Sequence, residues 1–126
     1  MRVVIDTHAF LWPITDDSRM PGRVRALIAD SDCCFSVASI WEAVVKVQSG
    51  KVYLPQPAGP FLVSELASSG VQILSITLDH VLRVETLEMH HRDPFDRILI
   101  AQSLEENLPV LTIDPLFKKY PVQLIW

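Results

Sequence analysis

Short apolar runs alternate along the chain with stretches of helical periodicity. Each run is four to six residues long, which is typical of buried strands rather than of helices. The first run ends in an acid, Asp6, and we expect a loop after it. The predicted strands cover residues 2–6, 33–37, 71–76, 110–113 and 122–125, with the last at a sheet edge.

Between these runs, apolar residues recur three or four positions apart, which predicts helices. Val24, Leu27 and Ile28 show this spacing. Residues 13–21 are polar and rich in turn formers, and three prolines with one glycine in residues 54–60 predict an ordered connection. The predicted helices cover residues 22–29, 39–49, 61–67, 78–89 and 93–107, with a short one at residues 116–120.

Two of these helices begin with capping sequences. Ser39 and Glu42 have the Ser-x-x-Glu spacing of a capping box. Asp93 stands before Pro94, an order typical of an N-cap followed by the first helical position. Glu42 and Asp96 are therefore each predicted to lie in the first turn of a helix.

Strands separated by helix-length segments predict an α/β fold, with a mostly parallel central sheet and helices on both faces. With 126 residues, 49% of them hydrophobic, the chain fits one domain spanning residues 1–126. In such sheets, ligands bind beyond the carboxyl ends of the strands, near the point where the strand order reverses. We therefore look for function at that edge.

Charge and cysteine content limit the setting in which the protein works. Cys33 and Cys34 are the only cysteines and are adjacent in an apolar run, which favours buried thiols and a reducing, cytoplasmic location. The sequence shows no signal peptide and no membrane-spanning stretch. The net charge of -4 argues against binding nucleic acid through general positive charge, so an RNA-binding protein of this composition needs bound cations or a local basic rim.

Four acids are expected to meet in one cleft. Asp6 and Asp114 each follow a predicted strand, while Glu42 and Asp96 each begin a predicted helix. Carboxylate oxygens suit Mg²⁺ or Mn²⁺, and clustered carboxylates repel one another unless cations neutralise them. A bound divalent cation is therefore expected.

Each acid, taken alone, also has a local explanation. Glu42 could close the capping box with Ser39, Asp96 could favour the positive end of its helix, and Asp114 before Pro115 could cap a short helix. Only Asp6 has no capping role if a loop follows it.

Other chemistries find little support. The four glycines do not form a phosphate-binding loop, and the sequence holds no G-x-S-x-G nucleophile motif. His8, His90 and His91 lack the paired spacing typical of zinc ligands.

Four segments of the chain, together about a third of it, resemble the successive motifs of a known family. They are VVIDTHAFLW, SVASIWEAVVK, HHRDPFDRILIAQS and VLTIDPLFKKY. In order and spacing they are similar to the motifs of PIN-domain proteins, specifically the VapC-type toxins.

This resemblance implies a metal-dependent endoribonuclease that hydrolyses RNA phosphodiester bonds, with Mg²⁺ as the cofactor and Mn²⁺ as a substitute. The family's acids fall on Asp6, Glu42, Asp96 and Asp114 of this sequence. Asp93 resembles an additional supporting acid. Thr7, Ser39 and Thr112 resemble the polar neighbours that orient the carboxylates.

The resemblance also implies partners. VapC-type proteins are held inactive by a small VapB-type antitoxin and commonly form homodimers, so we expect both here. Phe10, Trp12 and Trp41 are candidates for such contacts, or for the core. A basic rim for the RNA phosphates is our own inference, with candidates Arg92, Arg97, Lys46, Lys118 and Lys119.

Competing readings remain open. A receiver-like signalling domain would need clustered acids after the first strand, and Asp6 has no acidic neighbour. A phosphatase with an aspartyl nucleophile would need a second acid two positions later, where His8 stands. A PIN domain without catalytic activity, acting only as an RNA-binding or protein-binding module, is the remaining alternative.

Overall fold

The computed structural model describes the backbone of residues 1–15 and 22–126, and the side chains of residues 1–11 and 22–126. All five predicted strands are present, most of them shorter than predicted. The strands are β1 (Arg2–Ile5), β2 (Asp32–Ser36), β3 (Gln72–Leu74), β4 (Val110–Leu111) and β5 (Leu124–Ile125).

The strands form one parallel sheet in the order β3-β2-β1-β4-β5. The chain moves outward from β1 to β2 and β3 and then returns to β4 and β5 on the other side of β1. Val4 of β1 is therefore paired with Val110 of β4, although they are far apart in the sequence. The strand order reverses between β1 and β4, which is where the fold class predicts a ligand site.

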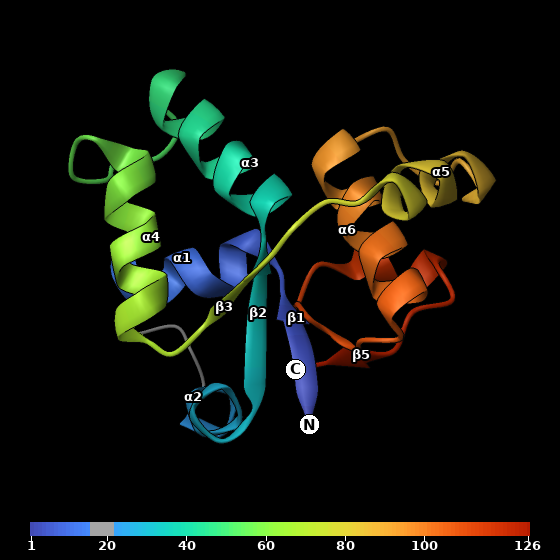
Figure 1. Cartoon of the computed structure of the whole chain (residues 1–126), viewed down its shortest axis with the longest axis horizontal. Coiled ribbons are helices and arrows are strands. Elements are labelled where there is room, and N and C mark those ends of the chain that lie inside the picture. The colour runs from blue at the N-terminus through green and yellow to red at the C-terminus, as the bar shows by residue number, and fades with distance from the viewer. Residues whose placement is uncertain (16–21) are drawn as a thin grey trace.

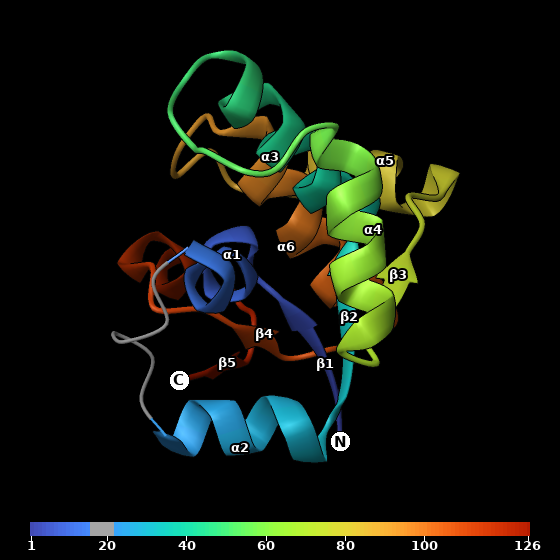
Figure 2. The same cartoon turned by 90° about the vertical axis from the view of Figure 1, so that its left-hand side faces the viewer.

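Helices cover both faces of the sheet, as predicted. Figures 1 and 2 show α1, α2 and α4 on one face and α5 and α6 on the other. The helices are α1 (Thr7–Thr15), α2 (Gly22–Asp30), α3 (Val37–Gln48), α4 (Ala58–Ser68), α5 (Leu78–Thr86) and α6 (Pro94–Glu106), with a 3-10 helix, η2 (Pro115–Lys119).

Alternating side chains of β1 supply the two cores. Val3 and Ile5 pack with Phe10 and other residues on the α1 face, whereas Val4 packs with Ile100 and its neighbours on the α6 face. Burying an apolar side chain of this size contributes roughly 1.5–3 kcal/mol relative to leaving it exposed. The sheet that carries the strand ends is thus held from both sides.

The segment after β1 differs from its prediction. Helix α1 begins immediately at Thr7, because the backbone carbonyl of Asp6 accepts the N–H groups of Ala9 and Phe10. Ala9, Phe10 and Leu11 are consecutive and all buried, so this part of the sequence shows no helical periodicity. The turns predicted for residues 13–21 are wrong for residues 13–15, which are helical, and residues 16–21 lie outside the described part of the chain.

The start of α3 also corrects the sequence prediction. The helix begins at Val37, and its N-cap is Ser36, whose side chain accepts the N–H of Ala38 at 3.0 Å. The capping box of Ser39 and Glu42 is therefore wrong, because both residues lie inside the helix and are buried.

Helix α4 begins at Ala58, within the predicted connection, and Pro60 is accommodated in its first turn, where a missing N–H costs no helical hydrogen bond. None of the helices in the described part of the chain has the length and apolar character needed to cross a bilayer.

Candidate active site

Asp6 and Asp114 lie at the carboxyl edge of the sheet, beyond β1 and β4. Thr112 connects them, because its hydroxyl donates to Asp6 Oδ2 at 2.9 Å and accepts the backbone N–H of Asp114 at 3.0 Å. Asp114 also caps η2 by accepting the N–H of Leu116 at 3.0 Å. The local explanation of Asp114 as a cap is therefore correct, and it leaves Asp114 beside Asp6.

Glu42 reaches the same edge from α3 and is almost fully buried. Its Oε1 accepts the Thr7 hydroxyl at 2.7 Å, and its Oε2 lies 2.8 Å from the Lys46 ammonium. Lys46 Nζ is also 3.0 Å from His8 Nε2. A buried carboxylate needs such partners, because an unpaired buried charge is strongly unfavourable. The Lys46 ammonium therefore places one positive charge beside these acids.

Asp93 and Asp96 enter the site from the start of α6. Asp93 is the N-cap, as predicted, and accepts the N–H groups of Phe95 at 2.9 Å and Asp96 at 3.2 Å. Asp96 is only 9% exposed, and its Oδ2 lies 3.3 Å from His91 Nε2.

The pKa of Asp96 indicates that the other acids lie close enough to act on it. Burial, which is the largest cause, and four neighbouring carboxyl groups together raise the pKa of Asp96 to about 8, far above the ordinary value of 3.8. The four carboxyl groups contribute in the order Asp93, Asp6, Glu42 and Asp114. The four predicted acids and Asp93 therefore share one cluster.

The pKa of Asp6 is also raised, although neighbouring groups lower it in part. Burial raises its pKa most, and the nearby Glu42 raises it further. The Thr112 hydroxyl and the charge of His8 lower it. Charges that repel in this way are stabilised by a cation that binds between them.

The donor set fits a hard divalent cation. Among the described residues, no three His, Cys, Asp or Glu side chains are arranged to hold a metal ion directly. Mg²⁺ keeps several water molecules when bound and is usually held by one or two carboxylates together with substrate phosphates. The buried, mutually repelling carboxyls supply the charge that such a hydrated cation requires.

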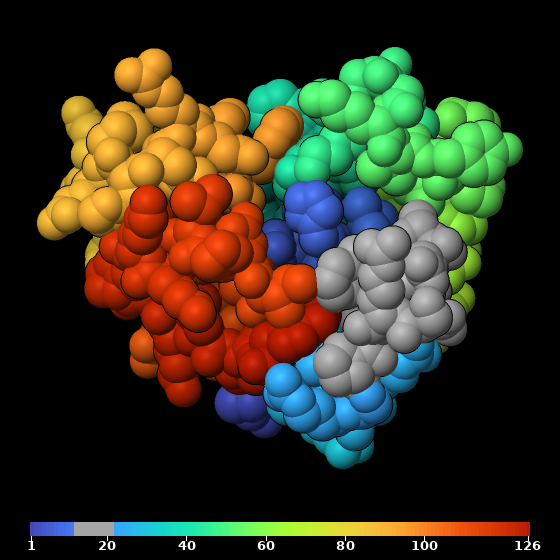
Figure 3. Space-filling view, turned by 180° about the vertical axis from the view of Figure 1, so that it is seen from behind, coloured from blue at the N-terminus to red at the C-terminus, as the bar shows by residue number. Residues whose placement is uncertain are grey.

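The surface around the acids is hollowed. Figure 3 shows blue N-terminal residues at the floor of a hollow framed by green residues of the α3 region and by orange and red C-terminal residues. A groove of about 330 Å³ is lined in part by Glu42, Lys46 and Asp93, and a second of about 260 Å³ by Thr112, Asp114 and Lys118. Both grooves include acids of the cluster, so an extended ligand has room on two sides of it.

The assignment of Arg97 to the basic rim is wrong. Arg97 is buried, and its guanidinium donates to backbone carbonyls of the segment after α5 and to the Tyr120 hydroxyl, so it is a structural residue. Arg92, Lys118 and Lys119 are exposed, and Lys46 is paired with Glu42. Of the predicted orienting residues, Thr7 and Thr112 contact the acids, whereas Ser39 is buried in α3 and its role stays a prediction.

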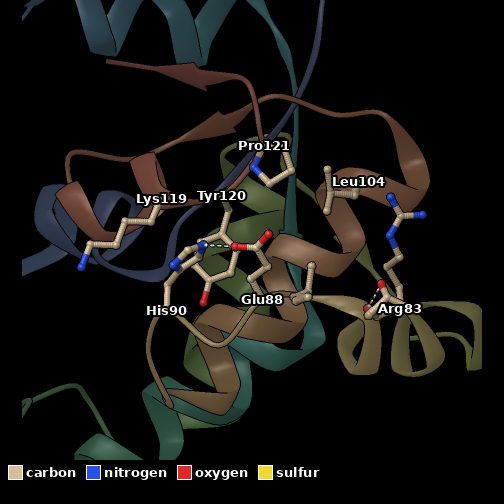
Figure 4. Close-up of a pocket in the computed structure, with 9 residues that line it drawn as sticks. Arg83, Glu88, His90, Leu104, Lys119, Tyr120 and Pro121 are labelled. Atoms are coloured by element: carbon tan, nitrogen blue, oxygen red, sulfur yellow. Dashed lines mark hydrogen bonds and ion pairs between the residues drawn. The ribbon is translucent and has the colours of Figure 1, made fainter.

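Sequence reasoning missed His91 and Tyr120. His91 contacts Asp96 through one ring nitrogen and the Tyr120 hydroxyl through the other. Tyr120 also lines a pocket of about 520 Å³, together with Arg83, Glu88, His90 and other residues (Figure 4). None of the acids of the cluster lines this pocket. The signal in the sequence is the pair of adjacent histidines, His90 and His91, shortly before Asp93 and Asp96.

Comparison with known families gives one match that covers almost the whole sequence. The family model described as PIN domain matches residues 3–123. No curated protein matches the chain.

Solved structures with the same architecture include VapBC proteins bound to DNA and a toxin–antitoxin complex. VapBC2 from Rickettsia felis, bound to a DNA fragment from their promoter, has a TM-score of 0.74 at 15% identity, over 99% of this chain and 98% of that chain. DNA-bound VapBC from Salmonella typhimurium gives 0.73 at 15% identity, over 99% and 97%. A toxin–antitoxin complex from Klebsiella pneumoniae gives 0.66 at 18% identity, over 98% and 96%. At these identities the likeness shows a shared fold.

Proposed function

The chain belongs to the PIN domain family, and from this premise we propose that it is a VapC-type endoribonuclease that depends on Mg²⁺, with Mn²⁺ as a substitute. The observation that carries the proposal is the buried acid cluster at the point where the strand order reverses, with the pKa of Asp96 raised to about 8. Maintaining such a cluster is costly unless it binds a cation. Asp6, Glu42, Asp96 and Asp114 would hold the hydrated ion, in part through its bound water molecules.

When bound, the divalent ion would lower the pKa of a water molecule and stabilise the oxygen that leaves the phosphate. The chain's own residues prepare this chemistry. Thr7 holds Glu42 and Thr112 holds Asp6, each through a hydroxyl donor, so these carboxylates keep fixed orientations. Lys46 balances the charge of Glu42, and exposed Lys118, in the groove beside Asp114, could contact a flanking phosphate.

The proposal includes the partners and setting expected of a toxin. The Klebsiella pneumoniae structure is a toxin–antitoxin complex, and the Rickettsia felis and Salmonella typhimurium structures are VapBC proteins bound to DNA, which supports a VapB-type antitoxin as the partner here. The family match over residues 3–123 supports one domain spanning residues 1–126. An enzyme that cleaves cellular RNA acts in the cytoplasm, so this location is part of the proposal.

A homodimer is also proposed, and α3 offers a surface for it. Val37, Trp41 and Val45 recur every four residues along α3 and are all exposed, with Trp41 60% exposed and its ring edge-on to Phe95 at 4.9 Å. Exposed apolar stripes of this kind are typical of interaction surfaces. Phe10 is instead a core residue, and the Trp12 side chain lies outside the described part.

We therefore expect Trp41→Asp to convert a dimer of the purified chain into a monomer at micromolar concentration. Tyr53→Asp is the matched control, because Tyr53 is also exposed but lies in the loop between α3 and α4. Light scattering coupled to gel filtration measures the mass. An unchanged dimer in Trp41→Asp would rule out this face as the interface.

The function is tested by inducing the chain in bacterial cells and sequencing the 5′ ends of their RNA. We expect growth arrest and new RNA ends at defined positions with the wild type, and neither with Asp96→Asn. Co-expression of a cognate antitoxin should restore growth. Equal effects from the wild type and Asp96→Asn would contradict catalysis, and RNA binding without new ends would favour the non-catalytic alternative.

A further inference from the structure

Arg97 starts a chain of buried and partly buried hydrogen bonds that leads to Asp96. Its NH1 donates to the backbone carbonyl of Glu88 at 3.0 Å and to the Tyr120 hydroxyl at 3.1 Å. Its NH2 donates to the carbonyls of Val84 and Leu87 at 3.3 and 3.4 Å. A guanidinium has only donors, so Tyr120 must accept from it. The direction of the first bond is therefore fixed.

Tyr120 passes this direction on to His91. The Tyr120 oxygen lies 2.8 Å from His91 Nδ1, and the two rings meet at 63° with centroids 5.5 Å apart. His90 packs edge-on against the same ring at 4.9 Å, and Figure 4 shows it beside Tyr120 in the pocket. The hydroxyl accepts from Arg97 and still has its own proton to donate. In the arrangement in which that proton goes to Nδ1, His91 Nδ1 is an acceptor.

An acceptor at Nδ1 places the ring hydrogen of His91 on Nε2. That nitrogen lies 3.3 Å from Asp96 Oδ2, and the side chain of His91 is only 11% exposed. With this tautomer, Arg97 NH1 donates to Tyr120, Tyr120 donates to His91 Nδ1, and His91 Nε2 donates to Asp96 Oδ2, so each donor along the chain has an acceptor. Partners of this kind fix the orientation of a metal-binding side chain.

We propose that His91 and Tyr120 are positioning residues that hold the Asp96 carboxylate, through Oδ2, in a fixed orientation beside the other acids of the cluster. This role rests on the proposed function, because it concerns Asp96 as a ligand. His91 acts through Asp96 and does not itself contact the cation or the RNA. Arg97 anchors the chain from the segment after α5.

The first test is independent of metal and RNA. Long-range ¹H–¹⁵N spectra of the histidine rings report which ring nitrogen carries the hydrogen. We expect His91 to be the Nε2-H tautomer in the wild type at pH 9.5, where the Asp96 carboxyl group is ionised and can only accept. Its Nδ1 shift should move in Tyr120→Phe, which lacks the donated proton. A hydrogen on Nδ1 of wild-type His91 would overturn the chain of hydrogen bonds.

The second test measures Mn²⁺ binding to the purified chain by electron paramagnetic resonance. His91→Leu, which removes the donor, should weaken binding about tenfold. His91→Gln should largely restore it, because its amide NH₂ reaches a position similar to that of Nε2. His90→Leu is the matched control, since His90 contacts Glu88 and the Tyr120 ring but not Asp96, and it should bind like the wild type.

The outcomes separate this role from the proposed function. Wild-type binding in His91→Leu, together with lost binding in Asp96→Asn, would overturn the positioning role alone. Unchanged binding in Asp96→Asn would overturn Asp96 as a ligand, and with it the role given to His91, whereas the tautomer would still decide the hydrogen-bond chain. Equal losses in His91→Leu and His91→Gln would also contradict positioning by a donor.

Discussion

Asp96→Asn is expected to stabilise the metal-free protein at pH 8, although it removes a carboxylate on which the proposed catalysis depends. The pKa of Asp96 is about 8 in the folded chain and near 3.8 in the unfolded one, because burial and the neighbouring acids oppose its charge. The folded state therefore binds this proton more tightly. Its stability falls as the pH rises above 3.8 and levels off above about 8.

The measurement is urea unfolding in chelator at pH 5 and pH 8. Because the pKa of Asp96 is raised in the folded chain, the free energy of unfolding of the wild type should fall by up to about 3 kcal/mol between these pH values. A pKa difference of one corresponds to about 1.36 kcal/mol. Asp96→Asn should lose much less, and added Mg²⁺ should restore stability to the wild type at pH 8. Asp79→Asn, at an exposed acid in the first turn of α5, should behave like the wild type. Equal pH dependence in the wild type and Asp96→Asn would contradict the repulsion argued for the cluster.

Arg97→Met is expected to lower the free energy of unfolding by at least about 2 kcal/mol, because hydrogen bonds to a charged group contribute roughly 1.5–3 kcal/mol and Arg97 makes several. Arg97→Lys should also destabilise, since an ammonium cannot reproduce the planar fork of donors. Urea unfolding at constant pH gives these values.

Lys119→Met is the control for this prediction. Lys119 is exposed near the end of η2, so its loss should change stability by no more than about 0.5 kcal/mol. A stable Arg97→Met variant that has lost only its affinity for RNA would contradict the buried role and return Arg97 to the basic rim.

The sequence was informative where a feature depends on neighbouring residues. A short apolar run followed by Asp6 predicted both the strand and the position of the acid at its end, and Asp93 before Pro94 predicted the N-cap of α6. The alternation of strands and helices predicted that the strands of the sheet are parallel, as they are. These signals place Asp6, Asp96 and Asp114 at one edge of the sheet, whereas Glu42, predicted in the first turn of its helix, lies in the second turn of α3.

Features that depend on packing between distant segments could not be predicted. Arg97 looks like an exposed charge in the sequence, and only the packing of α5 against α6 surrounds it with carbonyl groups. Tyr120 lies 29 positions from His91, and no local pattern joins them. Helix α1 was missed because its buried residues are consecutive.

Cleavage of a mixed pool of structured RNA by the purified chain tests the central claim most directly. The account predicts cutting at defined sites with Mg²⁺ or Mn²⁺, no cutting in chelator, and recovery when metal is restored. Asp6→Asn and Asp96→Asn should be slower by about 1,000-fold, which corresponds to the several kcal/mol that metal ions contribute to such reactions. Cutting that persists in chelator, or that proceeds at the wild-type rate in both variants, would contradict the assignment of this acid cluster as the active site.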